Sequence, residues 1–187
     1  MTAVDWTAQL VGQLEWHWTH QLRPRLAGLS DEEYFWEPVP GAWNVRPRGT
    51  SMAPMQAGGG AFTVDFAFPA PEPAPVTTIA WRLAHLIVGV FGARVAGHFG
   101  GPPAEYPTWE YAGTADEALR QLDAAYDAWI AGVGGLDEAA LARPCGAAEG
   151  PWADHPMAEL VLHINREAIH HGAEIALLRD LYAHRAH

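Results

Sequence analysis

The chain has 187 residues, a formal net charge of −11 and no lysine, so its 11 basic residues are all arginines. These arginines are outnumbered by 22 acidic residues and form no basic stripe that could neutralise phosphates, which argues against a nucleic-acid partner. With 49% hydrophobic and 18% charged residues, the chain is expected to fold as one globular domain spanning residues 1–187.

Residues 4–26 are expected to form the first helix, because apolar residues recur at helical spacing and Pro24 stands near the end. Its apolar face is expected to contain Trp6, Leu10, Leu14 and either His17 or Trp18. The residues before it carry neither a positive region nor a long apolar run, so we predict no signal peptide.

A cytoplasmic location without a membrane partner is predicted from two further features. The only cysteine, Cys145, lies in a loop-like stretch and cannot form an internal disulfide, which agrees with a reducing compartment. The most apolar stretch, residues 83–97, is interrupted by His85 and Arg94 and is shorter than the roughly 20 residues that a membrane span needs.

The connection from the first to the second helix is about fifty residues long, far longer than bundle loops usually are. It is rich in proline, glycine and aromatic residues, and residues 62–68 alternate apolar with small or polar side chains. This alternation predicts a short strand or hairpin. The insertion is therefore expected either to decorate the end of the bundle or to cover a site.

The second helix is expected to begin at Thr77 or Thr78, both good capping residues, and to continue to about Phe99. The Gly-Gly-Pro-Pro sequence at residues 100–103 should end it.

The third helix is expected to open at Thr114, a capping residue followed by acidic residues that suit a helix N-terminus. The fourth should start after His155, with Pro156 in its first turn, and run to about Tyr182. Four amphipathic helices of this length predict an all-α four-helix bundle with a long irregular insertion between helices one and two.

The last helix carries three residue types that bind metals, namely Glu167, His170 and His171. Spacing by four residues places Glu167 and His171 on one apolar stripe. The apolar members of that stripe are Leu160, Ile164, Ile175 and Leu178. Imidazole and carboxylate groups on a core-facing stripe are costly unless they are paired, hydrogen-bonded or bound to a metal. A bound metal is the first hypothesis.

The register of this helix leaves an alternative open. A competing stripe runs through His163, Glu167, His170 and Glu174. We prefer Glu167 with His171 because that register keeps the apolar residues inward. His163 and His170 would then lie at the rim or orient a ligand, although either could replace His171 or Glu167 as a ligand.

His85 on the second helix is the third candidate ligand, if the two helices are neighbours. A lone buried histidine is more often a hydrogen-bonded core residue, but the pair on the last helix makes ligation an equal alternative. Because residues 77–99 contain no Asp or Glu, a mononuclear site is favoured over a dinuclear one. Three protein ligands leave a position open for water or thiolate, as in catalytic zinc sites. For His17 and His20 a structural role is preferred.

Other chemistries lack support in the sequence. The only serines, Ser30 and Ser51, do not stand in a Gly-x-Ser-x-Gly motif. The glycines at residues 58–60 are not followed by the lysine of a phosphate-binding loop, so they read as a flexible turn.

The chain resembles the DinB-like superfamily of four-helix bundles, which includes YfiT-like metal hydrolases and the N-terminal domain of mycothiol-dependent maleylpyruvate isomerase. The resembling motifs are Leu-Ser-Asp-Glu-Glu-Tyr-Phe-Trp-Glu-Pro at 29–38, Pro-Gly-Ala-Trp at 40–43, Ala-Trp-Arg-Leu-Ala-His-Leu at 80–86, Arg-Glu-Ala-Ile-His-His-Gly at 166–172 and Leu-Leu-Arg at 177–179. Their order and spacing cover nearly the whole chain.

The resemblance implies one divalent metal ion, held by a histidine of the second helix and two ligands one turn apart on the last. Members often use a His-x-x-x-His pair, whereas Arg166 stands four residues before His170 here. The isomerase-like Glu-x-x-x-His pattern matches Glu167 and His171, so these two and His85 are the implied metal ligands. Family members are frequently homodimers, and some use a low-molecular-weight thiol such as mycothiol as cosubstrate.

The leading functional hypothesis is a metal-dependent thiol transferase, isomerase or hydrolase that acts on a small molecule. Histidine and carboxylate ligands suit zinc, nickel, iron and manganese alike. A substrate carboxylate could be bound by Arg82, Arg166, Arg46 or Arg48. The alternative is a non-catalytic dimeric bundle, structural or stress-related, in which the cluster binds a metal for stability or binds none.

Overall fold

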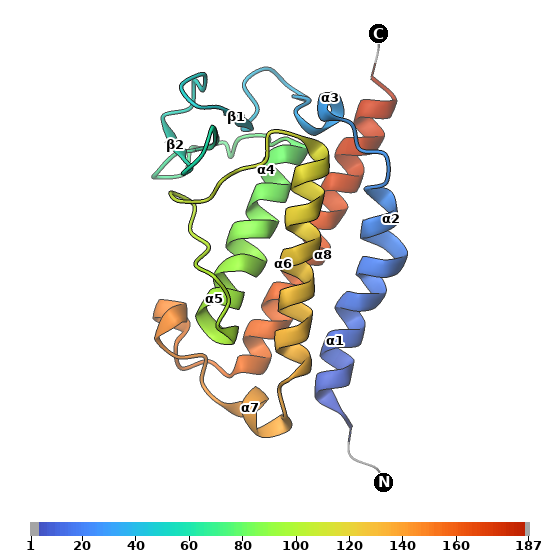
Figure 1. Cartoon of the computed structure of the whole chain (residues 1–187), viewed down its shortest axis with the longest axis vertical. Coiled ribbons are helices and arrows are strands. Elements are labelled where there is room, and N and C mark those ends of the chain that lie inside the picture. Colours follow the sequence, from blue (N-terminus) through green and yellow to red (C-terminus); the bar gives the residue numbers. More distant parts are fainter. Residues whose placement is uncertain (1–3, 186–187) are drawn as a thin grey trace.

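The computed structural model describes residues 4–185, which form a bundle of four long helical segments with a small sheet at one end (Figure 1). The first segment comprises α1 (Trp6–His17), the π-helical η1 (Trp18–Leu22) and α2 (Arg23–Arg25). The second comprises α4 (Ile79–Ala84), the π-helical η2 (His85–Gly92) and α5 (Ala93–Phe99). The third and fourth are α6 (Ala115–Gly134) and α8 (Met157–Ala183). The predicted four-helix bundle is thus confirmed. The prediction about a signal peptide rests partly on residues 1–3, which lie outside the described residues.

The helix ends follow the local chemistry of the sequence. The hydroxyls of Thr78 and Thr114 each accept a hydrogen bond, at 3.2 Å, from the backbone amide three residues further on, which caps α4 and α6. The second segment ends at Gly100, whose φ of 70° glycine adopts without steric cost. Pro156 precedes α8 as its extended N-cap residue instead of entering the first turn.

Each long segment packs against two others. The first segment contacts α6 and α8, and the second segment contacts the same two helices. The second segment and α8 are therefore neighbours, which is the arrangement that the candidate ligands require. The largest side chains buried between the segments include Leu14, Leu83, Leu122, Trp129, Ile164 and Ile175.

The first helix differs from its predicted apolar face. Trp6 is 57% exposed, because it is the first residue of α1 and lies at the end of the bundle beside Leu136. His17 and Trp18, which we expected to be alternatives, are both buried. The helix widens to a π-helix at Trp18, whose ring stacks on Tyr126 of α6 with centroids 3.8 Å apart.

The insertion between the first two segments contains the short α3 (Asp31–Tyr34) and an antiparallel sheet of β1 (Val45–Pro47), β2 (Met55–Ala57) and β3 (Phe62–Phe66). The strand predicted near residues 62–68 is β3, the centre of the order β1-β3-β2. Val64 pairs with Val45 on one side and Ala57 on the other. The sheet lies at the end of the bundle near α4 (Figure 1).

Asp65 in β3 attaches the insertion to the bundle. Its buried carboxylate accepts hydrogen bonds from the backbone N–H of Asn44 at 3.0 Å and from Arg46 Nε at 2.9 Å. The Ser51 hydroxyl donates a third, at 2.5 Å. The backbone carbonyl of Asp65 accepts a hydrogen bond from the indole of Trp81 in α4, at 2.8 Å. The sheet is therefore tied to the helix turn that precedes His85.

The opposite end of the bundle holds α7 (Glu138–Ala142) and the 3₁₀-helical η3 (Ala147–Trp152), between α6 and α8. Glu149 of η3 accepts a hydrogen bond from His98 Nε2 at 2.8 Å and lies 3.3 Å from Arg94 Nη2. Because the Glu149 side chain is only 8% exposed, this contact anchors η3 to α5.

The second segment has the bounds predicted for the second helix, from just after Thr78 to Phe99. Residues Ile79–Phe99 form 21 continuous helical residues, and their most apolar 18-residue window has a mean hydropathy of 1.4, so by length and composition the helix could cross a membrane. The prediction that the apolar stretch is too short to span a membrane was wrong, because the helix also includes residues 79–82 and 98–99, which flank that stretch. However, 56% of its most apolar window is buried inside the protein, as in a core helix of a soluble protein.

We expect Asp65→Ala to lower the free energy of unfolding by about 2–3 kcal/mol, because one buried donor and two partly buried donors lose their acceptor. Urea denaturation followed by circular dichroism measures the loss. The control is Asp180→Ala, which removes the exposed partner of Arg25 and should cost less than about 1 kcal/mol. Equal losses in the two variants would contradict the role given to Asp65.

Candidate metal centre

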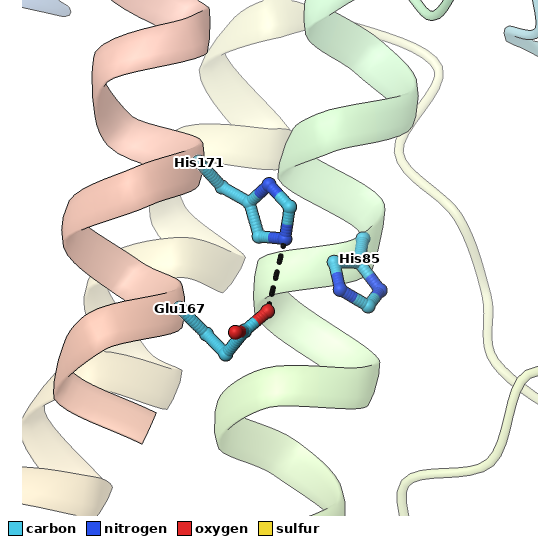
Figure 2. A group of neighbouring side chains, drawn as sticks. All are labelled: His85, Glu167 and His171. Carbon is cyan, nitrogen blue, oxygen red and sulfur yellow. Dashed lines mark ion pairs between the residues drawn. The ribbon is translucent and has the colours of Figure 1, made fainter. Parts of the chain in front are cut away.

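Three predicted ligands from two neighbouring helical segments meet at one place. His85 is the first residue of the π-helical η2, and Glu167 and His171 lie one turn apart on α8. One ligand atom of each residue lies within 4.8 Å of the other two. Figure 2 shows His85 on its own helix, facing the α8 pair. π-Helical turns are frequent at functional sites, and this one starts at the candidate ligand.

The contacts inside this group are short. Glu167 Oε2 lies 3.4 Å from His171 Nε2, the pair joined by a dashed line in Figure 2. The rings of His85 and His171 meet edge to face, with centroids 4.8 Å apart and planes at 84°. The His171 residue is 7% exposed, His85 is half-buried, and 28% of the Glu167 side chain remains exposed. The group is therefore open to solvent mainly on the carboxylate side.

Burial along α8 follows the preferred register. His171 is buried together with the four apolar residues of the predicted stripe, Leu160, Ile164, Ile175 and Leu178. The side chains of His170 and His163, from the competing stripe, are 63% and 42% exposed. His170, His171 and Glu174 nevertheless form a second group with ligand atoms within 4.8 Å of one another. The two groups share His171.

Each imidazole of the first group is held through its Nδ1 atom. His171 Nδ1 lies 2.6 Å from Glu174 Oε2, and that oxygen lies 3.1 Å from Arg82 Nε. His85 Nδ1 lies 2.7 Å from the hydroxyl of Tyr106. Histidine ligands of metals usually engage their second ring nitrogen in such a hydrogen bond, which fixes ring orientation and tautomer.

Two further residues fix the His85 ring. The Trp81 indole, tethered to Asp65, stacks on it with centroids 5.6 Å apart. Gly89 lets Tyr106 approach from the other side, because a Cβ at this position would overlap the Tyr106 hydroxyl. Tyr106 was not predicted from the sequence, because it lies in the irregular connection after α5, where no periodicity reveals what a side chain contacts. Glu174 was not predicted as the partner of His171, although their i, i+3 spacing carried that information.

The surroundings keep His85 neutral. Burial, followed by the neighbouring His171 and Arg82, lowers the pKa of His85 to about 4, against the opposing effect of Glu167 and Glu174. Burial raises the pKa of Tyr106 to about 12, so its hydroxyl keeps its proton at neutral pH. Burial also lowers the pKa of Arg82. A neutral imidazole is the form that binds a metal.

The donor set fits a divalent metal ion. It combines two imidazole nitrogen ligands and one carboxylate, and the Nδ1 atom of each histidine has a hydrogen-bond partner. His85 and His171 can therefore present the opposite ring edge to an ion.

Other candidate residues lie elsewhere. His17 faces α8 at Gly172, where its Nε2 atom is buried and, among residues 4–185, has no hydrogen-bond partner. His20 is exposed beside Trp16. Cys145 is half-buried near η3, so the protein's thiol is not part of the group.

Residues 60–175 match the family model of the DinB superfamily. Because the match covers more than half of the chain, the protein belongs to this superfamily. The matched range contains all three candidate ligands, whereas the resembling motifs at residues 29–43 and 177–179 lie outside it. Comparisons with curated proteins and with solved structures found no match. The similarity to the mycothiol-dependent isomerase stays a prediction.

In metal-free protein we expect His85 to titrate with a pKa of about 4 instead of its ordinary 6.5. Because the folded pKa is depressed, the contribution of neutral His85 to stability is complete above pH 6.5 and is lost as the pH falls through about 4. An NMR titration of the ring measures the midpoint, with His85→Ala identifying the resonance. A midpoint near 6.5 would contradict the burial argument.

Proposed function

We propose that His85, Glu167 and His171 hold one divalent metal ion, and that the protein is a metal-dependent thiol transferase, isomerase or hydrolase acting on a small molecule. The observation that supports it is the convergence of these ligand atoms within 4.8 Å, together with the Nδ1 contacts of both histidines. Membership of the DinB superfamily is consistent with this proposal but does not by itself specify a reaction.

A bound divalent ion lowers the pKa of a water or thiol that coordinates it, so a nucleophile forms near neutral pH. The residues of the chain prepare this site. Glu174 and Tyr106 hold the two histidine rings, and the low pKa of His85 keeps its lone pair free of a proton. Because Cys145 lies elsewhere, a thiol reaction here requires a low-molecular-weight thiol as cosubstrate. Nitrogen and carboxylate ligands suit zinc, nickel, iron or manganese.

The proposal includes a homodimer. Several large apolar side chains on α1 and α8 are exposed, and such surfaces are typical of protein interfaces. They are Trp6, Trp16, Leu177 and Leu181.

A non-catalytic bundle is the second candidate. The observation that favours it is the ion pairing already present, because Glu174 bridges Arg82 and His171. Glu167 also lies 3.4 Å from His171. These pairs stabilise the polar group without an ion, as a structural role would need.

We expect His85→Ala to abolish stoichiometric metal binding, because two ligands from one helix turn remain. Elemental analysis of protein purified without chelator measures the metal content. The matched control is His170→Ala, which removes an exposed histidine of the alternative group and should leave the content unchanged. Full metal content in His85→Ala, or its loss in His170→Ala, would refute the ligand assignment.

Removal of the metal should separate the two candidate functions. If the site is catalytic, we expect chelator-treated protein to keep its helical circular dichroism and melting temperature to within a few degrees, because the apolar core is independent of the site. Binding of a small thiol, measured by calorimetry, should disappear and return with metal. Unfolding on chelation would instead support the structural candidate.

A further inference from the structure

A pocket of about 490 Å³ lies beside the candidate metal centre and has no role in the proposal above. Its walls come from the part of α8 that precedes Glu167, from η3 with its flanking loops, and from α5. Small-molecule sites commonly have volumes of about 300–1,000 Å³ with apolar walls and few polar groups. The volume therefore suits a small organic ligand, and the wall combines apolar side chains with charged residues and histidines.

The pocket and the metal centre meet at Glu167. One carboxylate oxygen, Oε2, faces His171 in the metal group, at 3.4 Å. The other, Oε1, lies 3.9 Å from His163 Nδ1 and 4.0 Å from Arg166 Nε, and both of these residues line the pocket. A ligand in the pocket would therefore sit next to the side chain that would also bind the ion.

The carboxylates in the pocket wall are already paired. Glu149 contacts His98 at 2.8 Å and Arg94 at 3.3 Å. Glu159 lies 2.8 Å from His155. Each acid therefore already has a basic side chain as its partner, which weakens its attraction for a cationic ligand.

Arg166 is the cation that remains available. Its guanidinium donates a hydrogen bond to His163 Nδ1 at 2.6 Å, and its ion-pair contact within residues 4–185 is the 4.0 Å approach to Glu167. If Glu167 binds the ion, the negative charge of its carboxylate is shared with the metal, and its attraction for Arg166 becomes weaker still. A guanidinium so placed matches a carboxylate, which it can bind through two parallel hydrogen bonds.

The rest of the pocket wall is apolar. Trp152 and Leu162 are 62% and 50% exposed, so they offer apolar surface that the fold itself does not cover. Leu160 also lines the pocket and is buried. An apolar body placed against these side chains would remove their surface from water.

We propose that this pocket binds small carboxylates with an apolar body, with the carboxylate at Arg166 and the body against Trp152, and that such molecules are the substrate class of the neighbouring centre. The assignment as substrate rests on the proposed metal-dependent function. The binding site itself rests on the pocket alone.

The test compares phenylacetate with phenylacetamide, which has the same apolar body but no charge. Calorimetry with the full chain, with and without zinc, should show phenylacetate binding about fivefold more tightly, which is the upper end of what a charge pair with an exposed arginine contributes. Arg166→Gln should remove this preference. The control Arg120→Gln, at an exposed arginine of α6, should keep it. Trp152→Ala should weaken both probes about equally.

Equal affinity of wild-type protein for the two probes, or an unchanged preference in Arg166→Gln, would overturn the proposal. Elemental analysis separates this failure from that of the proposed function. His85→Ala should lose zinc but retain the Arg166-dependent preference, because His85 does not line the pocket. If wild-type protein binds no zinc yet still prefers phenylacetate to phenylacetamide, the result would refute the metal-dependent function and support the carboxylate-binding site.

Discussion

The contact between the second helical segment and α8 is the constraint on which the site depends, because it places two imidazole rings against each other inside an apolar bundle. Polar groups there are costly unless each has a partner. His171 has Glu174 and His85 has Tyr106, both through Nδ1. The remaining edges of the rings lie close to Glu167, so the same packing that satisfies the histidines also assembles a possible ligand set.

The irregular parts of the chain complete this arrangement. The insertion reaches His85 through Asp65 and Trp81, while the connection after α5 supplies Tyr106. Gly89 makes room for the Tyr106 hydroxyl. The insertion was expected either to decorate the end of the bundle or to cover a site. In the structure it contacts Trp81 of α4, which in turn stacks on the candidate ligand His85. Such support restricts ring motion, which a precise metal site requires.

Glu167 connects two chemical environments. On one side its carboxylate lies beside the buried His171, and on the other it approaches His163 and Arg166, which line a pocket with a partly apolar wall. Bundles of the DinB superfamily share their helical frame, but a fold does not determine a reaction. For this chain the reaction depends on what binds at either side of one carboxylate, and the two sides can be tested separately.

The sequence determined the bundle and most of its boundaries, because helical periodicity, the Thr78 and Thr114 caps and the glycine at position 100 act locally. Spacing by four residues also placed Glu167 and His171 on one side of α8. The alternation of apolar with small or polar side chains at residues 62–68 predicted the strand β3. Only the tertiary structure decided that the second segment lies beside α8, that both His17 and Trp18 are buried, and that Tyr106 supports His85. These are contacts between residues distant in the chain, and no local pattern records which partners packing brings together. The two π-helical segments could not be predicted from the sequence either, since they depend on how each helix accommodates its neighbours.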